Sequence, residues 1–223
     1  MLLAVTYSLL YRWLYILHRE TGTTNFAHNW AEYKEGFPFG SASGELWLGL
    51  EYMHQLTSSK PYTLRIDLTG YHGDSKYAKF STFEVTSEAD KYRLLLGSYS
   101  GNVSTDEAQD RTDGFLYHNN SQFTTPDDDN DEMTSGSCIT ESTSCNCARG
   151  GFWYKHCAKF NPTSVYCHTN GCGFTLKNLH YDSFNGNGYT MSRITMMMRP
   201  REYAVERMIK LANSGIAFFG KCT

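Results

Sequence analysis

The chain of 223 residues is long enough for one large domain or two small ones, and an apolar content of 40% excludes wholesale disorder. The formal net charge is −3 and no basic stripe is present, so a nucleic-acid partner is not expected. Aromatic residues make up 15% of the chain and 19 residues are glycine, a composition typical of loop-rich domains.

The N-terminal run MLLAVTYSLLYRWLYIL is apolar, but it lacks the basic region and the cleavage site of a signal peptide. Arg12 interrupts this run, which is too short for a confident membrane span, so no span is expected.

The first third of the chain favours two short helices, over Asn29–Lys34 and over Glu45–Leu56. Apolar and polar residues then alternate, which predicts strands at Tyr62–Leu68, Tyr77–Val85 and Tyr92–Leu96. Polar turns separate these three strands. We therefore expect an antiparallel meander.

The amino-acid composition changes after about residue 115. Asp, Asn, Ser, Thr, Gly and Cys dominate up to residue 188, so regular structure should be sparse there. A short apolar strand returns at Met196–Arg199. The segment after Pro200 looks helical.

Six of the seven cysteines lie between Cys138 and Cys172, and the seventh is near the C-terminus. Clustered cysteines in a polar segment favour disulfides, which belong to an oxidising compartment. A zinc site is the alternative, but Cys145-Asn-Cys147 and Cys167-x4-Cys172 do not form a zinc-ribbon repeat. Because seven is odd, one thiol is free or pairs with another chain.

Six motifs follow one another in a fixed order along the chain. They are NWAEYKEGF (29–37), GELWLG (44–49), LRIDL (64–68), FTTPDDDND (123–131), GGFWYKHC (150–157) and MMMRP (196–200). Together they resemble the signature of fibrinogen C-terminal domains. The resemblance implies an α+β fold, with a twisted antiparallel sheet, short helices, and an irregular, disulfide-stapled subdomain that binds calcium and a ligand.

The resemblance also implies how the chain is divided. Residues 1–12 are interpreted as a truncated or atypical N-terminal segment, and the run from Trp13 onward as a buried strand. One domain spans residues 13–200, with its sheet region at about 13–115 and a returning strand at 194–200. The calcium and pocket subdomain covers about 116–193. Residues 201–223 form a helical tail without a counterpart in the family.

The acidic run that ends at Asp131 is the sharpest local signal in the sequence. Ca²⁺ prefers six to eight hard oxygen ligands, and an acidic loop followed by a turn can supply carboxylates and carbonyls. The resemblance implies Asp129, Asp131 and the carbonyls of Met133 and Gly136 as ligands, with Ser135 as the alternative to Gly136. Magnesium is less favoured because it needs a tighter octahedron. A solvated acidic turn is the competing interpretation.

The resemblance further implies that Cys157 is bridged to a cysteine upstream. Cys138 is the favoured partner, and Cys147 is the alternative. Cys167 and Cys172 are expected to pair with each other around a turn.

The ligand pocket of the family lies beside the calcium loop. The resemblance implies Tyr154, His156, Ala158, Tyr181 and Tyr189 as its candidates in this chain. Aromatic faces pack on acetyl methyl groups and on sugar C–H surfaces. Ala158 stands where the family usually has a histidine, and this change favours a protein-binding surface.

The leading functional hypothesis is a secreted, calcium-supported lectin that binds acetylated carbohydrate, oligomeric in its full-length form. The alternative is a receptor-binding or extracellular-matrix protein that acts through protein contacts, as in angiopoietins and tenascins. No enzyme activity is expected. His156 beside Cys157 is a poor catalytic dyad, because such groups usually come from distant parts of a chain.

Overall fold

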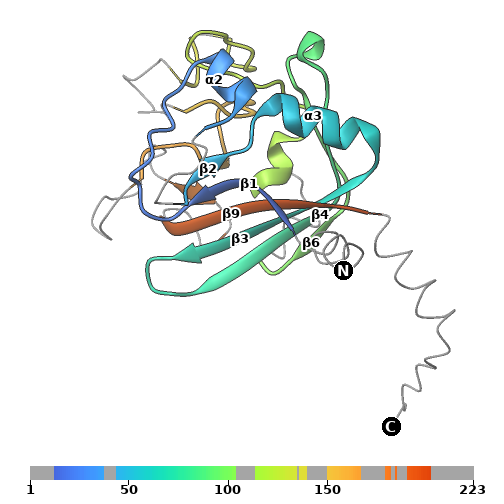
Figure 1. The fold of residues 1–223 in the computed structure, drawn as a ribbon. Coiled ribbons are helices and arrows are strands. Elements are labelled where there is room, and N and C mark those ends of the chain that lie inside the picture. Colours follow the sequence, from blue (N-terminus) through green and yellow to red (C-terminus); the bar gives the residue numbers. More distant parts are fainter. Residues whose placement is uncertain are drawn as a thin grey trace, which may run out of the picture.

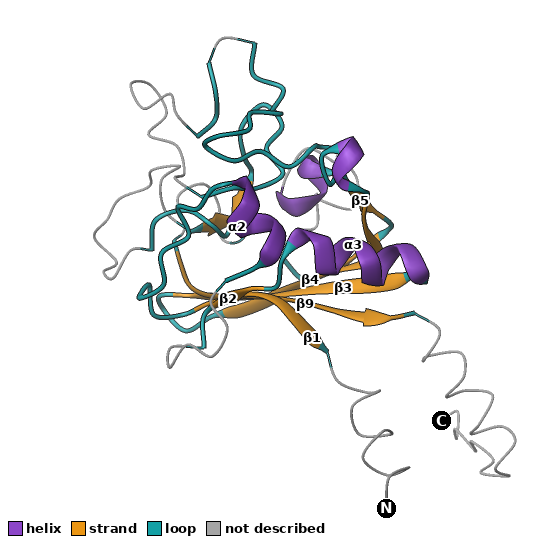
Figure 2. Ribbon diagram, turned by 45° about the horizontal axis from the view of Figure 1, so that its top comes forward, coloured by secondary structure: helices purple, strands orange, loops and turns teal. Residues whose placement is uncertain are grey.

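The computed structural model describes residues 13–37, 44–103, 114–134, 136–139, 150–166, 179–181, 184 and 190–201. An antiparallel sheet of seven strands forms one layer, and two helices cover one of its faces (Figures 1 and 2). Mostly irregular segments and a small second sheet pack at one end of this arrangement. The expected α+β fold is confirmed.

The main sheet consists of β1 (Leu14–Arg19), β2 (Leu46–Trp47), β3 (Tyr62–Gly70), β4 (Ser75–Val85), β5 (Leu94–Leu96), β6 (Tyr99–Gly101) and β9 (Met191–Pro200). Its order is β2-β1-β9-β3-β4-β5, with β6 paired to β4. The predicted meander corresponds to β3, β4 and β5. The returning strand is longer than predicted and lies between β1 and β3, where Met198 pairs with both Leu14 and Leu64.

Helix α2 (Trp30–Glu35) begins where the sequence predicts it, because Asn29 forms a capping box. The side chain of Asn29 accepts the N–H of Glu32, and the Glu32 carboxylate accepts the N–H of Asn29. The acidic group in the first turn also complements the helix dipole.

The helix predicted over Glu45–Leu56 is wrong in its first third. Helix α3 spans Leu50–Ser59, and the residues before it form β2 against β1. Strand pairing prevails here because Glu45 is fully buried and accepts main-chain N–H groups from residues 20, 21, 22 and 24. Gly49, with φ of +106°, then turns the chain into α3.

The third predicted strand also starts later than expected, at Leu94. The chain turns at Lys91 and Tyr92, which have φ values of +54° and +48°. This turn follows the short 3₁₀ helix η1 (Glu88–Asp90). Tyr92 is nevertheless fully buried, so its apolar character reflects core packing and not strand pairing.

The hydrophobic core runs without a break from the sheet into the irregular part. Phe123 packs against buried rings, with centroid distances of 5.2 Å to Tyr33, 5.7 Å to Trp47 and 5.2 Å to Trp153. All four side chains are buried, and burying each large ring contributes about 2–3 kcal/mol. The core therefore holds the segment around residue 123 firmly against the sheet.

Regular structure between residues 115 and 188 is sparse among the described residues, as predicted. It consists of the 3₁₀ helix η2 (Gly114–His118) and the pair β7 (Phe160–Asn161) and β8 (His180–Tyr181). The expected N-terminal segment 1–12 and the expected helix after Arg201 lie outside the described residues. Within the described part, no helix has the length and apolarity to cross a membrane.

Candidate calcium loop and binding surface

The acidic loop is held in place by the residue between its two candidate carboxylates. The side-chain amide of Asn130 donates to the carbonyl of Phe123 at 3.0 Å and to Oδ1 of Asp128 at 2.9 Å. Thr124 exchanges main-chain hydrogen bonds with Phe152, which ties the loop to the buried segment of residues 150–154. The positioning role of Asn130 was not predicted from the sequence.

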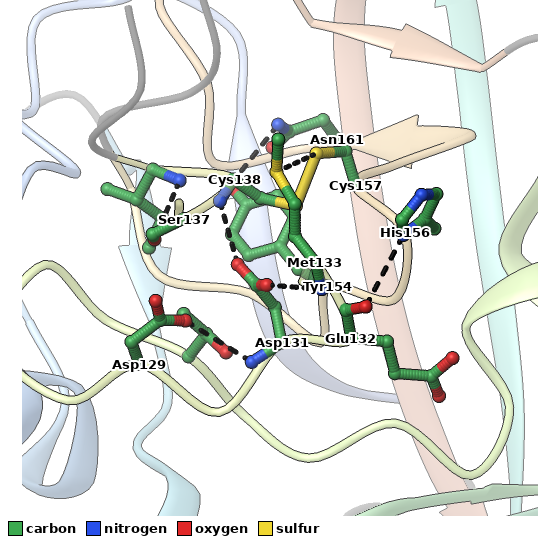
Figure 3. Close-up of a disulfide and its surroundings, with 12 residues drawn as sticks. Asp129, Asp131, Glu132, Met133, Ser137, Cys138, Tyr154, His156, Cys157 and Asn161 are labelled. Carbon is green, nitrogen blue, oxygen red and sulfur yellow. Dashed lines mark hydrogen bonds between the residues drawn. A yellow bond between two sulfur atoms is a disulfide. The ribbon is translucent and has the colours of Figure 1, made fainter. Parts of the chain in front are cut away.

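Figure 3 shows the side chains of Asp129 and Asp131 close together near the disulfide. Asp131 is half-buried, and its carboxylate accepts the N–H of Met133 at 2.8 Å and of Cys138 at 2.7 Å. Asp129 is exposed and accepts the N–H of Asp131 at 3.3 Å. The loop therefore presents two carboxylates on alternate residues.

The two neighbouring carboxylates of Asp129 and Asp131 favour a bound cation. Burial raises the pKa of Asp131, and the neighbouring charge of Asp129 raises it further, although two N–H groups oppose the shift. Hard carboxylate and carbonyl oxygens are the ligands that Ca²⁺ prefers. Among the described residues, no group of three or more His, Cys, Asp or Glu side chains could hold a metal, so a Ca²⁺ ion would also need carbonyl ligands. The carbonyls of Met133 and Gly136 are the expected ones; Ser135, the alternative to Gly136, lies outside the described residues.

A disulfide joins Cys138 to Cys157, the pairing that the resemblance favoured, with a Cα–Cα distance of 5.1 Å. Because Asp131 binds the N–H of Cys138, the acidic loop and the disulfide are directly connected (Figure 3). The sulfur of Cys157 is therefore not a free thiolate. The other cysteines named in the predictions, Cys147, Cys167 and Cys172, lie outside the described residues.

Two of the five predicted pocket residues are core residues. Tyr154 is 1% exposed and its hydroxyl donates to the carbonyl of Gly150 at 2.8 Å. Tyr181 is 0% exposed, and its ring centroid lies 5.0 Å from that of Phe160. Both rings are therefore packed in the core, and their assignment to a ligand pocket stays a prediction.

The remaining predicted pocket residues differ in how far they are exposed to solvent and in whether the structure describes them. His156 is exposed and its Nδ1 lies 3.4 Å from the carbonyl of Glu132. Ala158 is half-buried and packs against the core. Tyr189 lies outside the described residues. The structure thus brings His156 close to the acidic loop, whereas the two described rings, Tyr154 and Tyr181, are buried.

The same surface includes residues that sequence reasoning missed. The hydroxyl of Tyr117 donates to the carbonyl of His156 at 3.3 Å, and Nζ of Lys155 lies 5.7 Å from the centre of the Tyr117 ring. Glu132 is exposed beside them. No short motif marks these residues, because they come together only through the fold.

Beneath this surface, His118 joins three segments. Its Nδ1–H donates to the carbonyl of Trp153 at 2.7 Å, and its Nε2 accepts the N–H groups of Lys159 and Phe160, both at 3.2 Å. Complete burial lowers the pKa of His118 to about 3, so the ring is neutral. The histidine positions the segment that carries the disulfide.

Comparison with known proteins agrees with this architecture. A family model described as the C-terminal globular domain of fibrinogen beta and gamma chains matches residues 11–201. The chain belongs to this fibrinogen C-terminal domain family. Its expected membership is thereby confirmed.

The fibrinogen-like domain has relatives among the angiopoietins. It is 35% identical over 191 residues to angiopoietin-related protein 7 of Mus musculus, covering 86% of this chain and 52% of that protein. It is 36% identical over 192 residues to angiopoietin-4 of Homo sapiens, covering 85% of this chain and 34% of that protein. The chain thus spans about half or less of the length of these relatives.

Solved structures give the same result. The fibrinogen-like globe domain of human ANGPTL2 superposes with a TM-score of 0.71 at 33% identity, covering 85% of this chain and 80% of that one. Lamprey fibrin D-dimer, complexed with the peptide Gly-His-Arg-Pro-amide, superposes with a TM-score of 0.69 at 28% identity. That match covers 85% of this chain and 61% of the lamprey chain.

Proposed function

We propose that this fibrinogen-like domain is a secreted, non-enzymatic recognition module that binds another protein, as a receptor ligand or matrix component. The observation that carries the proposal is its identity of 32–36% with angiopoietins and angiopoietin-related proteins. The Cys138–Cys157 disulfide is consistent with an oxidising, extracellular environment.

The structure supports protein contact over acetylated carbohydrate. A sugar pocket needs aromatic faces that a ligand can reach, and Tyr154 and Tyr181 are buried. The surface beside the acidic loop instead carries exposed polar groups, His156 and Glu132, next to the ring of Tyr117. A mixture of polar groups and an aromatic ring is typical of protein interfaces.

Calcium is part of the proposal as a structural ion. Asp129 and Asp131, with the carbonyls of Met133 and Gly136, would hold Ca²⁺ in the loop that forms one edge of this surface. The ion would act by fixing the loop and not by contacting the partner. Because several domains held together bind more strongly than one, the full-length protein is proposed to be oligomeric.

The proposal predicts saturable binding of a dimerised domain to at least one member of a panel of receptor and matrix-protein ectodomains. We expect the His156→Ala variant to bind about tenfold more weakly, the effect of losing a central contact of about 1.4 kcal/mol. Tyr52→Ala is the control, because Tyr52 is 49% exposed on α3. Surface plasmon resonance measures both.

A glycan array and titration with N-acetylglucosamine provide the opposing test. If acetylated sugar binds at millimolar concentration in a calcium-dependent way, and no ectodomain binds, the protein-binding proposal is refuted and the domain is a lectin.

A further inference from the structure

Three cationic side chains surround a hollow of about 240 Å³ at the end of the sheet where β9 finishes. They are Lys79 from β4, Arg199 at the end of β9, and Arg201 just after it. Three hydroxyl side chains share the lining, namely Thr63, Ser81 and Ser100.

The hollow lies on the sheet face opposite the helices. Leu64, Phe80 and Met198 are fully buried in the core that α2 and α3 cover. Successive side chains of a strand point to opposite faces, so their neighbours Thr63, Lys79 and Arg199 point away from that core. This surface is therefore distinct from the acidic loop and its surroundings.

The fold holds these cations near one another. The guanidinium of Arg199 lies over the ring of Trp13, 4.5 Å from its centre. The main-chain N–H of Arg201 donates to the carbonyl of Pro61 at 2.8 Å. Lys79 pairs across the sheet with Ser100 of β6. All three positions are thus defined by packing or by main-chain hydrogen bonds.

Within the described part of the chain, no carboxylate forms an ion pair with Lys79, Arg199 or Arg201. Arg65 lies between Lys79 and Met197 across the sheet, but its Nε is 2.7 Å from Asp67. The charges of Arg65 and Asp67 therefore cancel each other. The hollow therefore concentrates positive charge on a protein whose formal net charge is −3.

We propose that this hollow binds a sulfate group of an extracellular sulfated polysaccharide. A sulfate presents several acceptor oxygens, which match cationic donors and hydroxyl groups, and its charge would relieve the repulsion among the cations. A nucleic acid is a poorer fit because the described residues that line the hollow include no aromatic ring for base stacking. The choice of a polysaccharide rests on the extracellular location in the proposed function.

The hollow is small, but Ser100 and Arg201 in its lining are exposed, so a linear polymer can place one charged group in it and continue across the surface. Binding there would leave His156 and the acidic loop free, because they lie elsewhere on the domain. Matrix attachment and partner recognition would then occupy separate surfaces.

The test is binding of a fully sulfated heparin oligosaccharide to the isolated domain. We expect binding that weakens with added salt, and about tenfold weaker binding for Lys79→Gln combined with Arg199→Gln. The matched control combines Lys34→Gln with Lys155→Gln, which removes the same charge from α2 and from the surface near the disulfide. The control should bind within about twofold of the unmodified domain.

Further binding experiments distinguish a sulfated polysaccharide from other anions. Chemically desulfated heparin, inorganic phosphate and phosphatidylserine vesicles should each bind at least about tenfold more weakly than heparin. Vesicle binding as tight as heparin binding would overturn the polysaccharide assignment, and equal losses in the two double variants would overturn the site. If the double variant does not fold, Lys79→Gln alone carries the test. Ectodomain binding by the same variant is measured separately, so a failed heparin result leaves the proposed function standing.

Discussion

His118 shows how one buried polar group organises the irregular half of the domain. The imidazole is completely buried and has a hydrogen-bond partner at each nitrogen. Its Nε2 faces two N–H donors, so a proton placed there would face two other protons. The neutral ring is therefore built into the native structure, and the charged ring is incompatible with it.

This arrangement predicts a loss of stability in mild acid. The folded-state pKa is about 3, whereas an unfolded histidine has a pKa of about 6.5, so between these values the unfolded chain binds more protons. The stabilisation is complete above pH 6.5 and is lost as the pH falls toward 3. We expect the free energy of unfolding to drop by about 2 kcal/mol between pH 7.5 and pH 5.

Urea denaturation at the two pH values measures this effect. In His118→Gln, the side-chain carbonyl can still accept the two N–H groups but does not titrate, so the drop should largely disappear. An equal drop in both proteins would show that another group causes it.

At the element scale, the end of α2 lies directly against the start of α3. A Cβ atom placed on Gly49 would lie 2.8 Å from the carbonyl carbon and oxygen of Glu35 and 2.9 Å from the carbonyl oxygen of Lys34. All three neighbours are main-chain atoms, which cannot move aside alone. Glycine is therefore required both by its φ of +106° and by the close approach of the two segments.

Gly49→Ala should lower the free energy of unfolding by about 3 kcal/mol, from backbone strain and steric overlap together. Gly73→Ala is the matched control, because Gly73 also has a positive φ, +85°, but no atom lies within 4 Å of its added Cβ. The control should lose only about 1 kcal/mol. Guanidinium denaturation compares them, and equal losses would contradict the close-contact explanation.

At the scale of the whole molecule, the acidic loop is joined to the sheet through the core and to the disulfide through Asp131. A cation bound there would therefore stabilise the native state as a whole. At a calcium concentration of about 100 times Kd, the stabilisation is about 2.7 kcal/mol, or about 5–10 °C in Tm for a domain of this size.

Thermal unfolding with calcium and with a chelator tests this prediction. Asp129→Asn should abolish most of the difference in Tm. Glu132→Gln removes one charge from the same loop, but Figure 3 shows its side chain directed away from the carboxylate pair, so the difference should persist. Equal Tm values of the unmodified domain in both buffers would refute the calcium proposal.

The sequence predicts the local features of this molecule better than the distant ones. The helix expected over Asn29–Lys34 and the alternation in β3 and β4 rest on local signals, and these elements form as expected. The position of β9 between β1 and β3 depends on pairing between the two ends of the domain, for which a single sequence carries no signal. For the same reason, Tyr154 and Tyr181 could not be assigned to the core before their neighbours were known.

The central place of β9 also bears on how the domain forms during synthesis. Leu14 pairs with Met198, so the first strand of the domain meets its main neighbour only after nearly the whole domain has been synthesised. At about 5–20 residues per second, this delay is on the order of ten seconds or more. During that time β1 and β3 both have an unpaired edge and apolar side chains, the features that make nascent β-rich chains prone to aggregate. A nascent chain stopped before Met191 would lack the strand that joins the two halves of its sheet, and chaperone dependence should be greatest just before this strand emerges.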